Sequence, residues 1–130
     1  MIKATLPMRK CDDFGCGHFG ASRGGRKHNG VDLACYPDTE IFPLKRGKVT
    51  KVGWPYKDYP EYRYVQITCE DGFDWRYFYI DPYVEVGDFC SPSNPIGKCQ
   101  DLTEIYETIT NHVHLEIKRD GEYMNPEDIA

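Results

Sequence analysis

The chain has 130 residues, enough for one domain with a buried core but too few for two. Its net charge of −5 argues against a nucleic-acid binder, which needs a basic face to displace the counterions of phosphates. No stretch approaches the roughly 18 apolar residues of a membrane span, and residues 1–10 lack the apolar centre of a signal peptide. The chain is therefore either not exported by that route or begins after a removed leader.

The first feature in chain order is a short glycine-containing loop between Cys11 and Cys16, which could close as a small disulfide ring. Strand signals dominate the rest of the chain. The segments that carry them are 39–43, 47–53, 62–70, 73–80, 84–89, a short piece near Ile96, 112–119 and 122–124. Residues 101–110 are the one plausible helix, with Asp101 as its N-cap, and we expect at most one or two turns.

The clearest pairing signal is Asp71-Gly72, a dipeptide typical of a tight turn. It predicts an antiparallel hairpin of 62–70 with 73–80, in which alternation places Trp75, Tyr77 and Tyr79 on one face. Short strands at close spacing without intervening helices imply an antiparallel sheet that is folded over or sandwiched. The predicted fold class is therefore mainly β with little helix.

Six cysteines are many for a protein of the reducing cytosol. Cys90 and Cys99 flank a turn-rich Ser-Pro-Ser-Asn-Pro loop that could bring them together, which would leave Cys35 and Cys69. Many other pairings are possible. Because no two cysteines form a CxxC pair, a four-cysteine zinc site is not expected.

Three of the four histidines fall in two compact groups, His28-Asn-Gly-Val-Asp32 and His112-Val-His114. Residues two apart in a strand share a face, so His112 and His114 can both point into one cavity. Gly30 would let the chain bend so that His28 and Asp32 converge. Two imidazoles and one carboxylate suit a tetrahedral zinc ion with its fourth position open.

These two groups resemble the signature pair of the lysostaphin-type (LytM-like) zinc endopeptidases. The resemblance runs from about residue 15 to the C-terminus. It implies a domain over residues 15–130, preceded by an N-terminal segment of residues 1–14. It implies a small antiparallel β-sheet folded as a sandwich-like domain. Further likeness lies in residues 37–42, 47–49, 84–88, 96–97, 114–117, 121 and 125–126.

The N-terminal half is most similar to the leukocyte cell-derived chemotaxin branch of this family. The segments that carry this likeness are 11–17, 21–23, 28–32 and 35, with 78–80 and 112–114 further along the chain. In that branch the counterparts of Cys11 and Cys16 are bridged. Its members are regarded as zinc-binding proteins without peptidase activity.

The resemblance implies that His28, Asp32 and His114 hold one zinc ion, with His112 as general base or as a stabiliser of the tetrahedral intermediate. The implied reaction is attack of a zinc-activated water on a peptide carbonyl. The implied substrate is the cross-bridge or stem peptide of peptidoglycan, which indicates an extracellular, cell-wall-facing or virion-associated protein.

The chain departs from active members at Ile80, where a histidine is expected after the tyrosine. Loss of one oxyanion donor typically slows a reaction about 100- to 1000-fold. Tyr77, Tyr79 or His18 could fill the gap as residues of the substrate groove.

Two functional hypotheses therefore stand beside each other. The first is a zinc endopeptidase of cell-wall peptide, impaired to some degree by Ile80. The second is a non-catalytic, zinc-stabilised module whose tyrosine-lined groove binds a peptide, glycan or protein. A weaker third idea is a component of a larger assembly, such as a phage tail.

Overall fold

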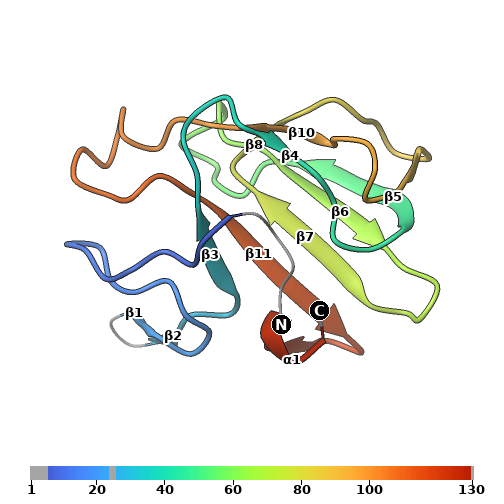
Figure 1. Ribbon diagram of the computed structural model, residues 1–130, viewed down its shortest axis with the longest axis horizontal. Helices are drawn as coiled ribbons and strands as arrows, with labels where there is room; N and C mark the ends of the chain where they lie inside the picture. Colours follow the sequence, from blue (N-terminus) through green and yellow to red (C-terminus); the bar gives the residue numbers. More distant parts are fainter. Residues whose placement is uncertain (1–5, 24–25, 130) are drawn as a thin grey trace.

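The computed structural model describes residues 6–23 and 26–129 (Figure 1). Within these ranges the regular secondary structure is almost all strand, connected by turns and loops, and no helix is long and apolar enough to cross a membrane. The elements are β1 Ser22–Arg23, β2 Arg26–Lys27, β3 Val31–Ala34, β4 Glu40–Ile41, β5 Gly47–Gly53, β6 Tyr64–Thr68, β7 Asp74–Phe78, β8 Ile80–Pro82, β9 Phe89–Cys90, β10 Gly97–Cys99, β11 His112–Arg119, β12 Glu122–Met124 and α1 Pro126–Ile129.

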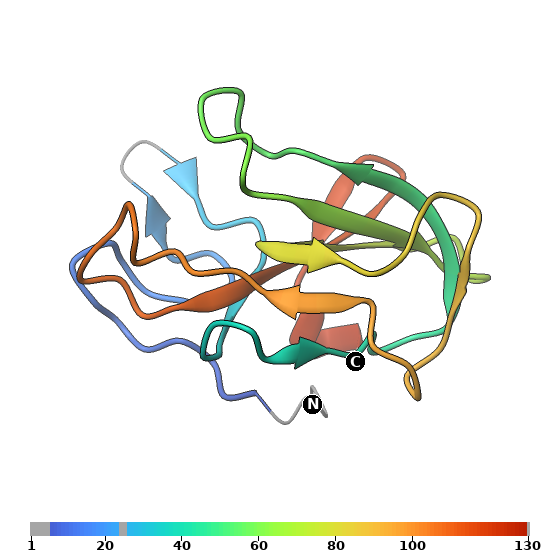
Figure 2. The ribbon, with the colours of Figure 1, turned by 90° about the horizontal axis from the view of Figure 1, so that it is seen from above.

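The largest unit is a seven-stranded antiparallel sheet in the order β12-β11-β7-β6-β5-β9, with β3 also paired to β11. β11 is its longest strand, with β7 on one edge and β3 followed by β12 on the other. A second, three-stranded sheet of order β4-β10-β8 packs over the first. Figure 2 shows these three short strands side by side, seen from above.

The two faces of the large sheet have different characters because its strands alternate apolar and polar residues. In β11 the core-facing residues Val113, Leu115 and Ile117 are at most 1% exposed. They pack with residues of the small sheet and its flanks, among them Ile41, Ile80, Ile96 and Cys99. Full burial of one such aliphatic side chain contributes about 1.5–3 kcal/mol. The alternate residues of β11 face the other way, and there the functional side chains gather.

The strand predictions hold for most of the sheet, and the mainly β fold class is confirmed. β5 and β11 have the predicted bounds, and β6 pairs antiparallel with β7 through Val65 opposite Tyr77. β3 was not predicted, and within 84–89 only Phe89 enters a strand.

The predicted helix over 101–110 is wrong, because this segment forms a series of separate turns. The Asp101 carboxylate accepts a hydrogen bond from the Thr103 amide at 2.9 Å, as an N-cap would, but this bond closes a local turn and does not begin a helix. The Leu102 amide donates to the side-chain oxygen of Asn111 at 2.7 Å. Side chains that satisfy these amides offer the backbone an alternative to a continuous helix.

Of the two predicted disulfides, one is confirmed and one is wrong. Cys11 and Cys16 are bonded, with an S–S distance of 2.00 Å. Cys90 and Cys99 are both free, because the loop between them connects two different sheets. Cys90 lies in β9 opposite Gly47 of the large sheet, whereas Cys99 lies in β10 of the small sheet.

Candidate metal centre

The centre forms where β3 lies against β11 on the face turned away from the core. Asp32 and His114 are direct cross-strand partners in this antiparallel pair. Such partners project to the same side with their Cβ atoms about 4.5–5.5 Å apart. The strand register alone therefore brings the carboxylate and one imidazole together.

Gly30 permits this close approach of the two strands. A Cβ at position 30 would lie 2.1 Å from the Leu115 carbonyl oxygen and 3.1 Å from the His114 ring. Gly30 does not have a positive φ. It therefore allows the close approach because it lacks a side chain, and not because it bends the chain in an unusual way. This is the physical reason for glycine between His28 and Asp32.

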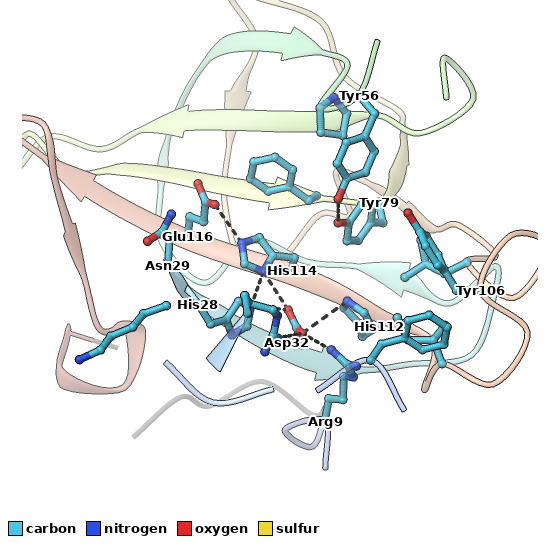
Figure 3. Close-up of a pocket in the computed structure, with 17 residues that line it drawn as sticks. Arg9, His28, Asn29, Asp32, Tyr56, Tyr79, Tyr106, His112, His114 and Glu116 are labelled. Carbon is cyan, nitrogen blue, oxygen red and sulfur yellow. Dashed lines mark hydrogen bonds and ion pairs between the residues drawn. The ribbon is translucent and has the colours of Figure 1, made fainter. Parts of the chain in front are cut away.

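Three ligand-type atoms meet at one point, as Figure 3 shows. His28 Nε2 lies 3.0 Å from both Asp32 Oδ1 and His114 Nδ1. His114 Nδ1 lies 2.8 Å from Asp32 Oδ1. A tetrahedral zinc with bonds of about 2.0–2.1 Å separates its ligand atoms by about 3.3 Å. A few tenths of an ångström of opening would therefore admit the ion.

Each of the two imidazoles makes a further hydrogen bond through its other ring nitrogen, on the side away from the cluster. His28 Nδ1 lies 2.9 Å from the His18 carbonyl oxygen, and His114 Nε2 lies 2.9 Å from Glu116 Oε1. Both partners are acceptors, so each ring can donate its outer N–H and would offer the lone pair of its inner nitrogen to a bound ion. This outer arrangement is typical of histidines that ligate a metal.

The cluster is also electrostatically suited to a cation. Burial opposes ionisation of Asp32, but hydrogen bonds with His114 and His28 outweigh it and hold the pKa of the carboxyl well below its usual range. Burial also opposes the charge of His114, yet its bonds to Asp32 and Glu116 raise the pKa to about 9. Without a metal, a proton on His114 thus supplies the positive charge that this cluster demands.

His112 lies beside the cluster but outside the group of three. Its Nδ1 donates to the Thr110 carbonyl oxygen at 2.8 Å, and its Nε2 lies 3.5 Å from Asp32 Oδ2. Burial lowers the pKa of His112, so the neutral ring keeps a free lone pair on Nε2.

The cluster opens into a cavity of about 370 Å³. Tyr56, Tyr79 and Tyr106 line its other side, and the Tyr79 ring lies edge-on to His112 at 5.6 Å between centroids. Tyr79 has φ +70°, a left-handed conformation that is uncommon outside glycine. This conformation interrupts the alternation between β7 and β8 and directs Tyr79 into the cavity, where its hydroxyl meets that of Tyr56.

The other groove candidates lie elsewhere. Tyr77 is 3% exposed, and its hydroxyl accepts from Leu44 N at 3.1 Å on the core side of the sheet, so its prediction is wrong. His18 is exposed and its ring does not line the cavity; only its carbonyl oxygen reaches His28. Ile80 is fully buried in the core and offers no polar group to the site.

Comparison with known proteins identifies the family of this chain. The family described as Peptidase family M23 matches residues 26–126, which is most of the chain. This chain belongs to peptidase family M23. The matched segment contains His28, Asp32, His112 and His114.

Relatives of this M23 domain include both animal proteins and microbial enzymes. Leukocyte cell-derived chemotaxin-2 of Mus musculus is 31% identical over 114 residues, covering 88% of this chain and 75% of that protein. The catalytic domain of the prophage-encoded M23 protein EnpA from Enterococcus faecalis superposes with a TM-score of 0.69 at 20% identity, covering 93% and 90% of the two chains. The catalytic domain of lysostaphin from Staphylococcus simulans gives 0.65 at 21% identity and covers 88% of each. The M23 domain thus has the lysostaphin-type fold.

Sequence reasoning missed several residues of this M23 site. Glu116 could have been found, because it follows His114 by two positions in the same strand and so shares its face. Arg9, Tyr56 and Tyr106 carried no such signal, because each comes from a loop or an early segment that only the folded chain brings to the cavity.

Proposed function

We propose that this M23 domain, residues 15–130, is a zinc-dependent endopeptidase that cuts peptide bonds of bacterial peptidoglycan. His28, Asp32 and His114 would hold the ion. The observation that carries the proposal is the convergence of their three ligand atoms within 3.0 Å of one another, in a cavity that His112 also lines. The donor set suits zinc, because two imidazoles and one carboxylate leave a fourth position open.

When bound, zinc would polarise a peptide carbonyl and make water acidic enough to attack near neutral pH. The bond from His112 Nδ1 to Thr110 fixes its tautomer, so Nε2 is the atom that can accept a proton. In this role His112 takes a proton from the attacking water and passes it to the departing amine.

Tyr79 is the group best suited to replace the histidine lost at Ile80. Burial raises the pKa of Tyr79 far above its ordinary value, so the phenol keeps its proton. When Tyr56 donates to Tyr79, the Tyr79 O–H remains free to stabilise negative charge on a substrate carbonyl oxygen.

A second candidate function is a non-catalytic, zinc-stabilised binding module. The observation that favours it is Ile80, which is 0% exposed and packs in the core where active members carry a histidine. The similarity to the chemotaxin agrees with this alternative. In such a module the tyrosine-lined cavity would hold a peptide or glycan without cutting it.

Both candidates fit an extracellular or cell-wall-facing setting, with peptidoglycan as the partner of the peptidase and a peptide or glycan ligand as the partner of the binding module. A virion-associated variant of this setting, in which the domain would sit in a larger assembly, is part of the same proposal.

Zinc-loaded protein incubated with purified peptidoglycan separates the two candidates. Sacculi with glycine cross-bridges and sacculi with direct cross-links should both be used, and new amino termini counted by mass spectrometry. We expect cleavage by the unaltered protein and by His18→Ala, a matched surface control, but none by His112→Ala. If the unaltered protein with full zinc releases no amines yet sediments with sacculi, the binding module replaces the peptidase.

A further inference from the structure

Two of the free cysteines, one after β3 and one at the end of β10, contact the same side chain, Asn111. Cys35 follows β3 directly and is half-buried, whereas Cys99 ends β10 and is 1% exposed. Although 63 residues separate them along the chain, both flank the side chain of Asn111.

The side chain of Asn111 makes hydrogen bonds to both cysteines. Its Nδ2 donates to the Cys35 carbonyl oxygen at 3.1 Å and to Cys99 Sγ at 3.4 Å. The Cys35 amide returns a bond to the Asn111 carbonyl oxygen at 2.9 Å. Cys35 also packs against the buried core cluster to which Cys99 belongs.

The geometry points to a second disulfide site, in which Cys35 and Cys99 bond to each other by exchange with a small disulfide such as oxidised glutathione. The Cys35 thiolate attacks one sulfur of that molecule and releases one thiol, leaving a mixed disulfide. Cys99 then gives up its proton and attacks the Cys35 sulfur, which releases the second thiol. The protein loses two electrons and the external disulfide gains them.

The order of attack follows from the surroundings of each sulfur. The influence of Cys35, together with burial, raises the pKa of the Cys99 thiol, so Cys99 keeps its proton in the reduced protein. Cys35 is the more exposed of the two and is therefore the sulfur that an external disulfide reaches first.

Neither remaining cysteine competes for this bond. Cys90 lies opposite Gly47 in the large sheet, and Cys69 directly follows β6, on the other side of β5. Both therefore lie in or directly after strands of the large sheet, and each serves as an internal control for nonspecific oxidation.

The bond would restrain the strand that carries Asp32. It would tie the end of β3, three residues after Asp32, to the small sheet, next to Asn111, which precedes β11. Closing so long a loop restricts the unfolded chain, and we expect oxidation to raise the Tm by roughly 10 °C.

The test equilibrates the purified full chain in glutathione buffers from reducing to oxidising. Remaining thiols are then alkylated and linked peptides mapped by mass spectrometry. We expect one new linkage, between the peptides that contain Cys35 and Cys99, while Cys69 and Cys90 stay alkylated. The Tm should rise on oxidation in the unaltered protein and in Cys90→Ser, but not in Cys35→Ser.

Full alkylation of Cys35 and Cys99 in oxidised protein that retains the Cys11–Cys16 bond would overturn the proposal. So would a stable glutathione adduct on Cys35 or a linkage to Cys69 or Cys90. If Cys35→Ser does not fold, the peptide map of the unaltered chain still decides. Zinc content and peptidoglycan cleavage do not enter this test, so its outcome is independent of the proposed function.

Discussion

The guanidinium of Arg9 donates to Asp32 Oδ2 at 2.7 Å, while Oδ1 of the same carboxylate lies 2.8 Å from His114 Nδ1. Arg9 thereby occupies one oxygen of Asp32 and leaves the other directed at the metal centre (Figure 3). Arg9 is only 4% exposed, and Asp12 holds it in place with two further hydrogen bonds. The segment before residue 15 therefore orients a proposed ligand.

Arg9→Met should weaken zinc binding about 10- to 100-fold, the usual cost of losing an outer partner of a ligand. The reason is that Asp32 Oδ2 would lose its shortest charged contact and keep only the longer one to Arg23 at 3.4 Å, so the carboxylate would be held less firmly. Titration against a competing chelator measures this affinity. Lys10→Met, an exposed neighbour, should leave it unchanged, and Arg9→Lys should restore part of the loss. Equal affinity in Arg9→Met and Lys10→Met would show that Arg9 does not position Asp32.

Removal of any proposed ligand should empty the metal centre. His114→Ala and Asp32→Ala each leave two donor groups, too few to retain zinc through dialysis, whereas His112→Ala keeps all three. Elemental analysis should find about one zinc per chain in His112→Ala and almost none in the other two variants. An empty site in His112→Ala would reassign His112 as a ligand.

Tyr79→Phe should lower kcat about 100- to 1000-fold with little change in KM, because it removes a donor needed only as charge develops on the substrate. Zinc content should stay the same. Tyr83→Phe is the matched control, since Tyr83 is exposed and lies outside the cavity. If both variants cleave peptidoglycan at the rate of the unaltered protein, the hydroxyl of Tyr79 has no catalytic role.

Gly30→Ala should destabilise the fold by about 3 kcal/mol or more, because the new methyl group would overlap the Leu115 carbonyl and push β3 away from β11. Gly72→Ala, in the β6–β7 turn, meets no atom within 4 Å but has φ +85°, so it should cost only about 1 kcal/mol. Urea unfolding of both variants gives the comparison. A smaller loss in Gly30→Ala than in Gly72→Ala would contradict the close-approach explanation.

Asp12→Asn should lower stability in a pH-dependent way. Burial opposes the charge of Asp12, but bonds from Arg9 and the Thr110 and Phe14 amides outweigh it and hold the pKa of this carboxyl below its usual range. Its stabilisation is therefore complete above the unfolded pKa of about 4 and is lost as the pH falls below it. In metal-free protein we expect a deficit of about 1.5–3 kcal/mol at pH 7 that shrinks by pH 3. Asp58→Asn, an exposed control, should show neither effect.

Local patterns predicted the strands that carry strong alternation. β5 and β11 were expected with their observed bounds because each places apolar residues on one face over a full strand length. β3 was missed because Val31–Ala34 is short, and its pairing with β11 depends on residues 78 or more positions away in the chain. Segment 101–110 was misread because side-chain bonds from Asp101 and Asn111 replace the helical ones.

The sequence by itself determined the mainly β fold, the Cys11–Cys16 ring and which side chains could form a metal centre, because these depend on alternation and short spacing. Tertiary structure alone decided that Arg9 donates to Asp32, and that Tyr79 turns into the cavity while Tyr77 stays in the core. It also decided that Asn111 contacts both Cys99 and Cys35, whereas Cys90 lies in the large sheet. Those outcomes depend on which strands pair and on one left-handed residue, and neither is visible in local periodicity.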